Sequence, residues 1–120
     1  MKNTGVLLYR NSAIRHIIKP LENKGYIIDL VGSLSSDNGR SNNDIDILLY
    51  IPKTNGNNLF DNFEKDLENL GFKYMFSDEK EGFGIFHNYC LKGKIGLDIW
   101  INEVDDLIYK NFLISVENYF

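Results

Sequence analysis

Two stretches decide how this chain folds: residues 31–33, which read Val-Gly-Ser, and residues 43–50, which read Asn-Asp-Ile-Asp-Ile-Leu-Leu-Tyr. A hydrophobic segment ends in Gly-Ser, a ten-residue spacer follows, and two aspartates then alternate with isoleucines at the head of an apolar run. Side chains alternate across a β-strand, so Asp44 and Asp46 share one face and the isoleucines share the other. The pattern predicts a strand with one face in the core and two carboxylates on the opposite face.

Two adjacent carboxylates repel each other, and a divalent cation relieves that repulsion. Mg²⁺ prefers oxygen ligands and often binds one or two carboxylates together with substrate phosphates. Asp98 lies between Leu97 and Ile99 in a second apolar strand pattern. If the two strands are neighbours, Asp44, Asp46 and Asp98 converge, and two metal ions (Mg²⁺, with Mn²⁺ as a substitute) could hold a phosphoryl centre between them.

The Gly32-Ser33 pair supplies a second feature of the same site. A glycine at the end of a strand lets the backbone approach a ligand closely. The amides of the following turn and the Ser33 hydroxyl can then donate hydrogen bonds to phosphate oxygens. We therefore expect Gly32 and Ser33 to bind the phosphates of a nucleotide, and Asp44, Asp46 and Asp98 to bind metal and act in catalysis.

The rest of the chain predicts one α+β domain, residues 1–120, with a single mixed sheet of about five strands and helices packed mainly on one face. Apolar spacing predicts helices over residues 14–24 and 59–70, and Pro20 should kink or split the first. Strands are expected over residues 26–31, 44–51, 72–76, 83–91 and 94–101, the last two forming a hairpin through Lys92-Gly93.

Three finer expectations follow from local patterns. Residues 77–82 are expected to form a charged turn, and Asn102 is expected to cap the final helix. The acidic residues of the helix over 59–70 should form a solvated surface. The buried stripe expected for the final helix consists of Val104, Leu107, Ile108, Phe112 and Val116.

Composition narrows the classes of function. The chain has 120 residues, of which 43% are hydrophobic and 25% charged, and its formal net charge is -4. This acidic balance argues against broad electrostatic binding of nucleic acid. The single cysteine, Cys90, excludes an internal disulfide and is expected to be a buried thiol on a strand. No apolar run is long enough to span a bilayer, so we expect a cytoplasmic protein without a membrane segment.

At the residues quoted above, the chain resembles the DNA polymerase β-like nucleotidyltransferase superfamily in its minimal single-domain form. The signature of that superfamily is a hydrophobic residue, Gly, then Gly or Ser, a spacer, and alternating acidic and hydrophobic residues. The resemblance implies that Asp44 and Asp46 bind both metal ions, that Asp98 binds the catalytic one, and that Gly32 and Ser33 hold the triphosphate. Asn43 stands where the superfamily often has Ser.

Larger relatives carry a helical domain that binds the acceptor, and this chain has no room for one. Minimal members often act with a second protein, so the resemblance implies a protein partner or a homodimer. The resemblance implies a Mg²⁺-dependent transfer of a nucleoside monophosphate from an NTP to a hydroxyl acceptor, with release of pyrophosphate. The acceptor could be a protein, a small molecule or an RNA end.

Two alternatives stay open from the sequence. The first is a nucleotidyltransferase fold that has lost catalysis and binds a partner, as an antitoxin-like or host-defence-interacting protein would; an exposed apolar patch at Phe112, Val116 and Phe120 would favour it. The second is a metal-dependent hydrolase that uses the same acids. No histidine accompanies the acids in sequence, and His87, on the strand over 83–91, is expected to be structural.

Overall fold

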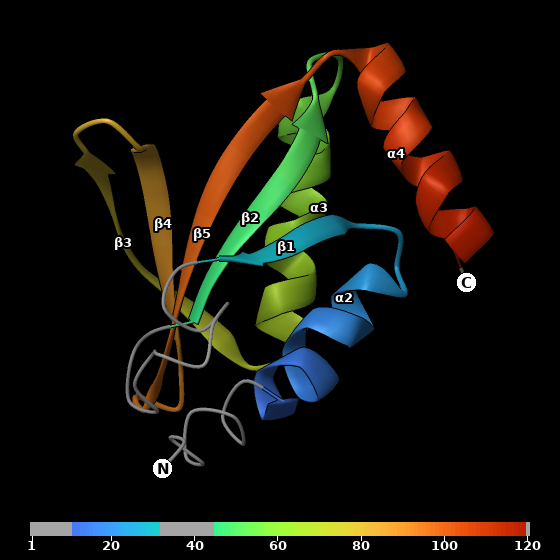
Figure 1. Cartoon of the computed structure of the whole chain (residues 1–120). Coiled ribbons are helices and arrows are strands. Elements are labelled where there is room, and N and C mark those ends of the chain that lie inside the picture. Colours follow the sequence, from blue (N-terminus) through green and yellow to red (C-terminus); the bar gives the residue numbers. More distant parts are fainter. Residues whose placement is uncertain (1–10, 32–44, 120) are drawn as a thin grey trace, which may run out of the picture.

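Five strands form one mixed sheet in the computed structural model, which describes residues 11–31 and 45–119 of the chain (Figure 1). The strand order is β1-β2-β5-β4-β3. The strands are β1 (Ile27–Val31), β2 (Ile45–Pro52), β3 (Phe72–Lys80), β4 (Gly84–Leu91) and β5 (Ile95–Val104). β2 and β5 run parallel, and every other neighbouring pair is antiparallel. The predicted mixed sheet of five strands is therefore confirmed.

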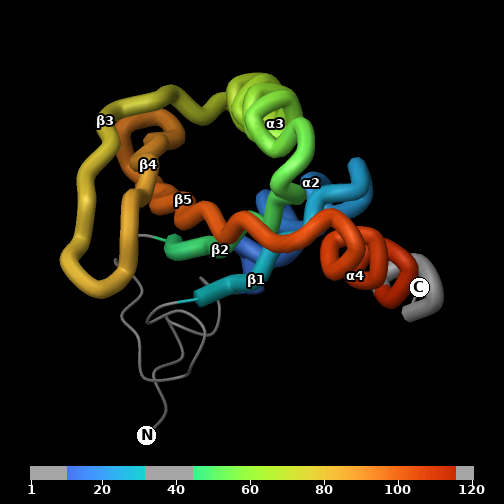
Figure 2. Tube along the Cα trace, turned by 90° about the horizontal axis from the view of Figure 1, so that it is seen from above, coloured from blue at the N-terminus to red at the C-terminus, as the bar shows by residue number. Residues whose placement is uncertain are grey.

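The helical elements are η1 (Ile14–Ile18), α2 (Lys19–Glu22), α3 (Gly56–Asn69) and α4 (Asp106–Tyr119). η1 is a turn of π-helix that continues directly into α2, and Pro20 stands among the first residues of α2. A proline lacks the backbone N–H and is best tolerated where a helix begins. The helix was expected to kink or split at Pro20; instead it continues through Pro20, and only its hydrogen-bonding pattern changes from π-helix to α-helix there. Seen from above, α2 and α3 lie on the same side of the sheet (Figure 2).

The two faces of β2 differ in burial as the alternation of the sequence predicts. Ile45, Ile47 and Leu49 are at most 1% exposed, whereas Asp46 and Leu48 are partly exposed. β5 repeats the pattern, with Leu97 and Ile99 fully buried. The buried faces of both strands join the core that η1, α2 and α3 supply from their side. We call the face that these three helices cover the helix side. We call the opposite face, which carries Asp46 at one end of β2 and Tyr50 beside Phe112 of the final helix at the other, the open face.

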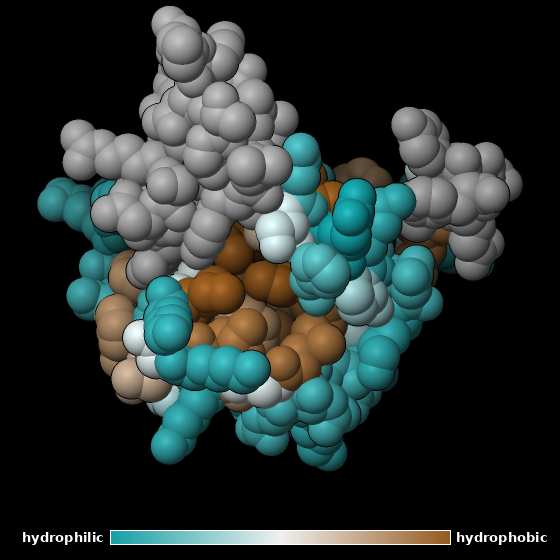
Figure 3. Space-filling view, turned by 90° about the horizontal axis from the view of Figure 1, so that it is seen from below, coloured by the Kyte–Doolittle hydropathy of each residue, from teal (hydrophilic) through white to brown (hydrophobic). Residues whose placement is uncertain are grey.

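Hydrophobic side chains are also visible on the lower end of the molecule, which Figure 2 does not show. Seen from below, they gather in the middle of that face, and polar side chains border them (Figure 3). No helix in the described ranges, 11–31 and 45–119, is long and apolar enough to cross a membrane.

The hairpin between β4 and β5 turns where the sequence predicted. Lys92 has φ 54° and Gly93 has φ 68°. Positive φ at both central residues is the geometry of a two-residue turn that matches the twist of the flanking strands. This turn sets the register of β4 against β5 and so decides which residues of the two strands lie side by side.

Two strands are longer than expected. β3 continues through Lys80 because residues 77–80 pair with β4 as far as Gly84, so the turn predicted over 77–82 begins only at residue 81. β5 continues to Val104, which pairs with Pro52 of β2, so Asn102 lies in a strand and caps no helix. In both cases backbone pairing with a neighbouring strand extends an element whose own side chains are polar.

The stripe predicted for the final helix is wrong at Leu107 and Ile108 and correct at Phe112, and the side chain of Val116 lies outside the described part of the structure. Tyr109 is 8% exposed, whereas Leu107 is 69% and Ile108 is 43% exposed. α4 begins at Asp106, whose Oδ1 accepts a hydrogen bond from the Thr54 N–H at 3.0 Å. Phe112 packs edge-on against Tyr50 of β2, with 5.4 Å between ring centroids. These contacts rotate α4 so that Leu107 faces away from the sheet.

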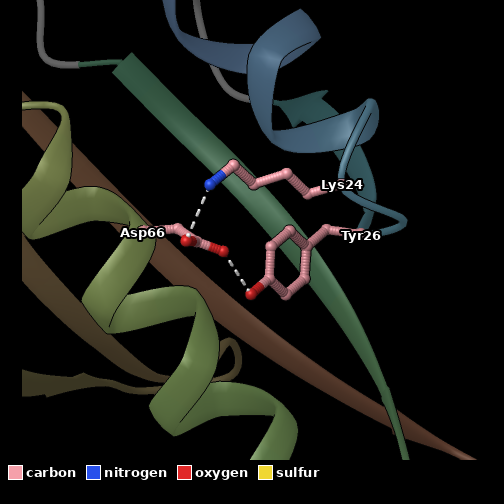
Figure 4. Close-up of polar contacts among 3 residues, drawn as sticks. All are labelled: Lys24, Tyr26 and Asp66. Atoms are coloured by element: carbon pink, nitrogen blue, oxygen red, sulfur yellow. Dashed lines mark hydrogen bonds and ion pairs between the residues drawn. The ribbon is translucent and has the colours of Figure 1, made fainter.

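A polar cluster on the helix side joins the start of β1 to α3 (Figure 4). The Tyr26 hydroxyl donates to Asp66 Oδ2 at 2.7 Å, and Lys24 Nζ donates to Asp66 Oδ1 at 3.0 Å. These two hydrogen bonds, that of Tyr26 first, hold the pKa of Asp66 below its usual value of 3.8. Glu64 likewise accepts from the buried Tyr89. The expectation that all acidic residues of α3 form a solvated surface was therefore wrong for these two.

Candidate functional site

Asp46 and Asp98 lie side by side on the open face of the sheet. β2 and β5 are parallel neighbours, and their register pairs Asp46 directly with Asp98. Adjacent strands are about 4.8 Å apart, so the two carboxylates project from neighbouring backbone positions. The condition set by the sequence, that the two strands be neighbours, is met. Gly32, Ser33 and Asp44 lie outside the described residues, and their roles remain predictions.

The Asp98 carboxylate is held by a neighbour that the sequence did not single out. Asn88 on β4 pairs in register with Asp98, and its Nδ2 donates to Asp98 Oδ1 at 2.6 Å. Asn88 is 8% exposed. This bond occupies one of the roughly four acceptor positions of a carboxylate, so it orients Asp98 and still permits further ligands. The only sequence signal was the alternation along β4, which places Asn88 on the face of Phe86.

A cavity of about 530 Å³ opens over this pair of carboxylates. Its volume falls within the range of pockets that bind small molecules. Its lining comes from β1, β2, β5 and the β3–β4 hairpin. The lining residues are Val31, Asp46, Leu48, Lys80, Phe83, Phe86, Asp98 and Trp100.

The donor set of this cavity suits a divalent cation in part. Two carboxylates on adjacent strands match the usual Mg²⁺ arrangement, in which one or two carboxylates share the ion with substrate phosphates and water. Within residues 11–31 and 45–119, no three acidic, histidine or cysteine side chains come close enough to form a metal site by themselves. Asp46 and Asp98 could therefore hold a metal only with ligands from outside this set, such as a substrate or Asp44.

Sequence reasoning also missed the aromatic and basic part of the cavity. Phe86 and Trp100 pair in register across β4 and β5, with ring centroids 4.9 Å apart. Phe83, in the turn before β4, has its centroid 6.4 Å from that of Trp100. Lys80 Nζ lies 5.4 Å from the centroid of Phe83. Only the strand register, which no pattern in the sequence reveals, brings these residues beside Asp98.

His87 lies on the other face of β4, away from Asp98. Its Nδ1 is hydrogen-bonded to Ser77 Oγ at 2.5 Å, and its ring packs against Phe60 of α3. Burial is the main cause that lowers the pKa of His87. This placement supports a structural histidine. Cys90 is half-buried on β4, where the sequence predicted a buried strand thiol.

Comparison with known proteins gives a likeness of fold. No protein-family model matches the chain. No curated protein matches it either. Among solved structures the chain is similar to Cid1, a polymerase β-like nucleotidyltransferase, with a TM-score of 0.52 and 14% sequence identity. The match covers 97% of this chain and 34% of Cid1, so the chain spans about a third of the length of that protein.

At this level of identity the likeness shows the fold alone. The chain has one mixed sheet of five strands with helices, and this fold is similar to that of Cid1. The structural plasticity of Cid1 is described as a basis for the RNA terminal uridylyl transferase activity of Cid1, and this statement concerns Cid1 alone.

Proposed function

We propose that this chain is a Mg²⁺-dependent nucleotidyltransferase, which transfers a nucleoside monophosphate from an NTP to a hydroxyl acceptor and releases pyrophosphate. The observation that carries the proposal is the register of Asp46 beside Asp98 on adjacent parallel strands, over a cavity of about 530 Å³. Two neighbouring carboxylates repel each other, and a divalent cation relieves that repulsion. We therefore infer that the two carboxylates bind a cation. The similarity of the fold to that of Cid1 favours phosphoryl transfer as the reaction at this site.

In the proposed reaction the acceptor oxygen forms a bond to the α-phosphorus as the bond from that phosphorus to the pyrophosphate oxygen breaks. Asp98 takes up the proton of the acceptor hydroxyl, and Asn88 holds the carboxylate in place through Oδ1. Mg²⁺ bound by Asp46 and Asp98, with Asp44 as the proposed third ligand, would supply charge neutralisation at the phosphates and activate the hydroxyl. Gly32 and Ser33, which follow Val31 in the chain, are proposed to bind the triphosphate.

An assay of nucleotide transfer, carried out on the parent protein and on Asp→Asn variants, tests the proposal. The protein is incubated with each of the four NTPs, labelled at the α-phosphate, with Mg²⁺ or Mn²⁺ and with candidate protein, small-molecule and RNA acceptors. Asp46→Asn should lower the transfer at least about a hundredfold, because the substitution removes charge with little change of shape. Asp61→Asn is the matched control, because Asp61 is exposed on α3, on the helix side of the sheet. Full activity in Asp46→Asn would contradict the proposal.

A second candidate function is that of a catalytically inactive fold that binds a protein partner. The observation in its favour is the apolar surface of α4, where Leu107 is 69%, Ile114 is 45% and Ile108 is 43% exposed. Calorimetry with NTP and Mg²⁺ separates the two functions. An enzyme requires triphosphate binding that weakens in Asp46→Asn, whereas a pure interaction protein needs no NTP at all.

A further inference from the structure

Three aromatic residues form one wall of the cavity: Phe83, Phe86 and Trp100, here called the aromatic wall. The ring centroid of Trp100 lies 4.9 Å from that of Phe86 and 6.4 Å from that of Phe83. Phe83 is 72% exposed, the largest exposed fraction among the large hydrophobic side chains of the described residues. Such exposure costs stability, so the wall contributes little to the core, and a ligand that covers it would recover that cost.

The aromatic wall lies next to the two carboxylates, further along the same face of the sheet. Trp100 follows Asp98 by two residues on β5 and so lies on the same face, about 7 Å further along the strand. Phe86 pairs with Trp100 just as Asn88 pairs with Asp98. The aromatic rings and the carboxylates therefore line the same cavity. In a nucleotide the base and the α-phosphate are separated by one sugar, which is a span of the same size.

The side of the carboxylates on which the wall lies is also informative. The strand order places β1 and β2 on one side of β5, and β4 and β3 on the other. Val31, which immediately precedes Gly32 in the chain, pairs with Asp46 from the β1 side. The wall is built from the β4 side. Val31 and the two phenylalanines of the wall therefore lie on opposite sides of the carboxylate pair.

Charge at the rim of the cavity fits the same kind of ligand. Lys80 lines the cavity and its Nζ lies 5.4 Å from the centroid of Phe83. An ammonium group so placed can interact with a phosphate, while aromatic faces stack on a flat ring. A ligand with a planar ring and phosphate groups matches the aromatic wall, Lys80 and the metal-binding carboxylates at once.

We propose that the aromatic wall is a nucleobase-stacking site, which holds the base of a nucleotide whose sugar and phosphate lie toward Asp46 and Asp98. The base has two possible sources: the NTP itself, or the terminal nucleoside of an oligonucleotide that serves as acceptor. The inference rests on the proposed function only for the place of the phosphate. Stacking itself requires neither metal nor turnover.

Trp100 is the single tryptophan of the chain, so its fluorescence reports on the wall directly. Four probes are titrated in Mg²⁺ buffer: ATP, UTP, inorganic tripolyphosphate and a triribonucleotide without a 5′-phosphate. N-acetyltryptophanamide corrects for light absorbed by the bases. A base stacked on the indole should quench saturably, and tripolyphosphate should not. Quenching by the NTPs assigns the base of the substrate, and quenching by the triribonucleotide assigns the acceptor.

Variants of the wall give the second measurement. Phe83→Leu should weaken binding of the quenching ligand about tenfold, since stacking on an aromatic side chain contributes substantially to the affinity for a base. Because Phe83 is 72% exposed, the variant should fold normally. Tyr74→Leu is the matched control: it removes an exposed aromatic residue of the same hairpin, which packs against Tyr89 and not against the wall.

The outcomes separate this inference from the proposed function. Saturable quenching without any nucleotide transfer would support the nucleobase-stacking site and contradict the proposed nucleotidyltransferase activity. Transfer with an unquenched Trp100, and with equal KM values in Phe83→Leu and the parent protein, would overturn the wall alone. A Trp100 signal that responds to protein concentration but to none of the four probes would also overturn it, because a second copy of the chain would then cover the rings.

Discussion

The two faces of β2 and β5 are built from alternate residues of the same strands, yet they differ in what they bury. On the helix side, Ile47, Leu49 and Ile99 are fully buried under α2 and α3. On the open face, Asp46, Leu48 and Trp100 stay partly exposed around a cavity. The helix side accounts for the stability of the fold. The charged and exposed aromatic side chains of the open face contribute little to stability, and this composition suits the binding of a ligand.

The acidic residues of the two sides show the same difference. Asp66, on the helix side, accepts hydrogen bonds from a lysine and a tyrosine, so its charge is compensated within the protein (Figure 4). Asp98, on the open face, lies beside a second carboxylate and accepts from the neutral amide of Asn88. Asp66 therefore stabilises the fold directly, whereas Asp46 and Asp98 place two carboxylates at a cavity that a ligand can enter.

The largest expected effect lies in the core. Phe63→Ala should lower the free energy of unfolding by about 4 kcal/mol, because Phe63 is fully buried and packs edge-on against Tyr26 at 4.9 Å. Leu48→Ala, on the open face, should cost about 1 kcal/mol, since a partly exposed side chain loses less burial. Urea unfolding measures both values. Equal costs would contradict the division of the sheet into a stabilising and a functional face.

The second largest effect is expected in the stabilisation that a bound ligand gives to the protein, because the ligand would contact the open face and not the helix side. An NTP analogue that cannot be cleaved, with Mg²⁺ and at about 100 times its Kd, should stabilise the protein by about 2.7 kcal/mol. Asp98→Asn should abolish most of this gain and leave the stability without ligand unchanged or slightly higher, since the variant relieves repulsion with Asp46. Thermal unfolding with and without the analogue provides the measurement. An undiminished gain in Asp98→Asn would refute the metal-binding role of Asp98.

A positioning role for Asn88 predicts a smaller effect. Asn88→Ala removes the hydrogen bond to Asp98 Oδ1 and should raise the Mg²⁺ concentration needed for half-maximal activity about tenfold, as loss of a supporting contact to a ligand does. Asn62→Ala, on the exposed face of α3, is the control. A merely structural Asn88 would instead lower the stability of the protein and leave its Mg²⁺ requirement unchanged.

The smallest expected effect concerns pH. Because the pKa of Asp66 in the folded protein is below 3.8, its charged form contributes stability that is fully present above that pH and is lost as the pH falls through the folded pKa. The difference in unfolding free energy between the parent protein and Asp66→Asn should therefore shrink below about pH 4. Urea unfolding at pH 6, 4 and 3 measures it. A difference that grows as the pH falls would have the wrong sign.

Several features were predictable because they depend on neighbours in the chain. Alternation along residues 45–51 and 95–101 identified the buried and open faces of two strands, and burial of Ile47 and Ile99 confirms the assignment. Lys92-Gly93 correctly predicted the hairpin, since its turn requires positive φ at both residues. The ends of β3 and β5 were predicted too short, because pairing with β4 and β2 outweighed the local turn and capping signals.

The sequence by itself determined that Asp46 and Asp98 lie on strands and that each faces away from the isoleucines beside it, because side-chain alternation is a local property of an extended chain. Only the tertiary structure decided that β2 and β5 are parallel neighbours, that Asn88 reaches Asp98, and that Phe83, Phe86 and Trp100 stand beside the carboxylates. These depend on strand order and register, which arise from packing between segments far apart in the chain. No local pattern encodes such packing, and in this protein it builds the candidate site.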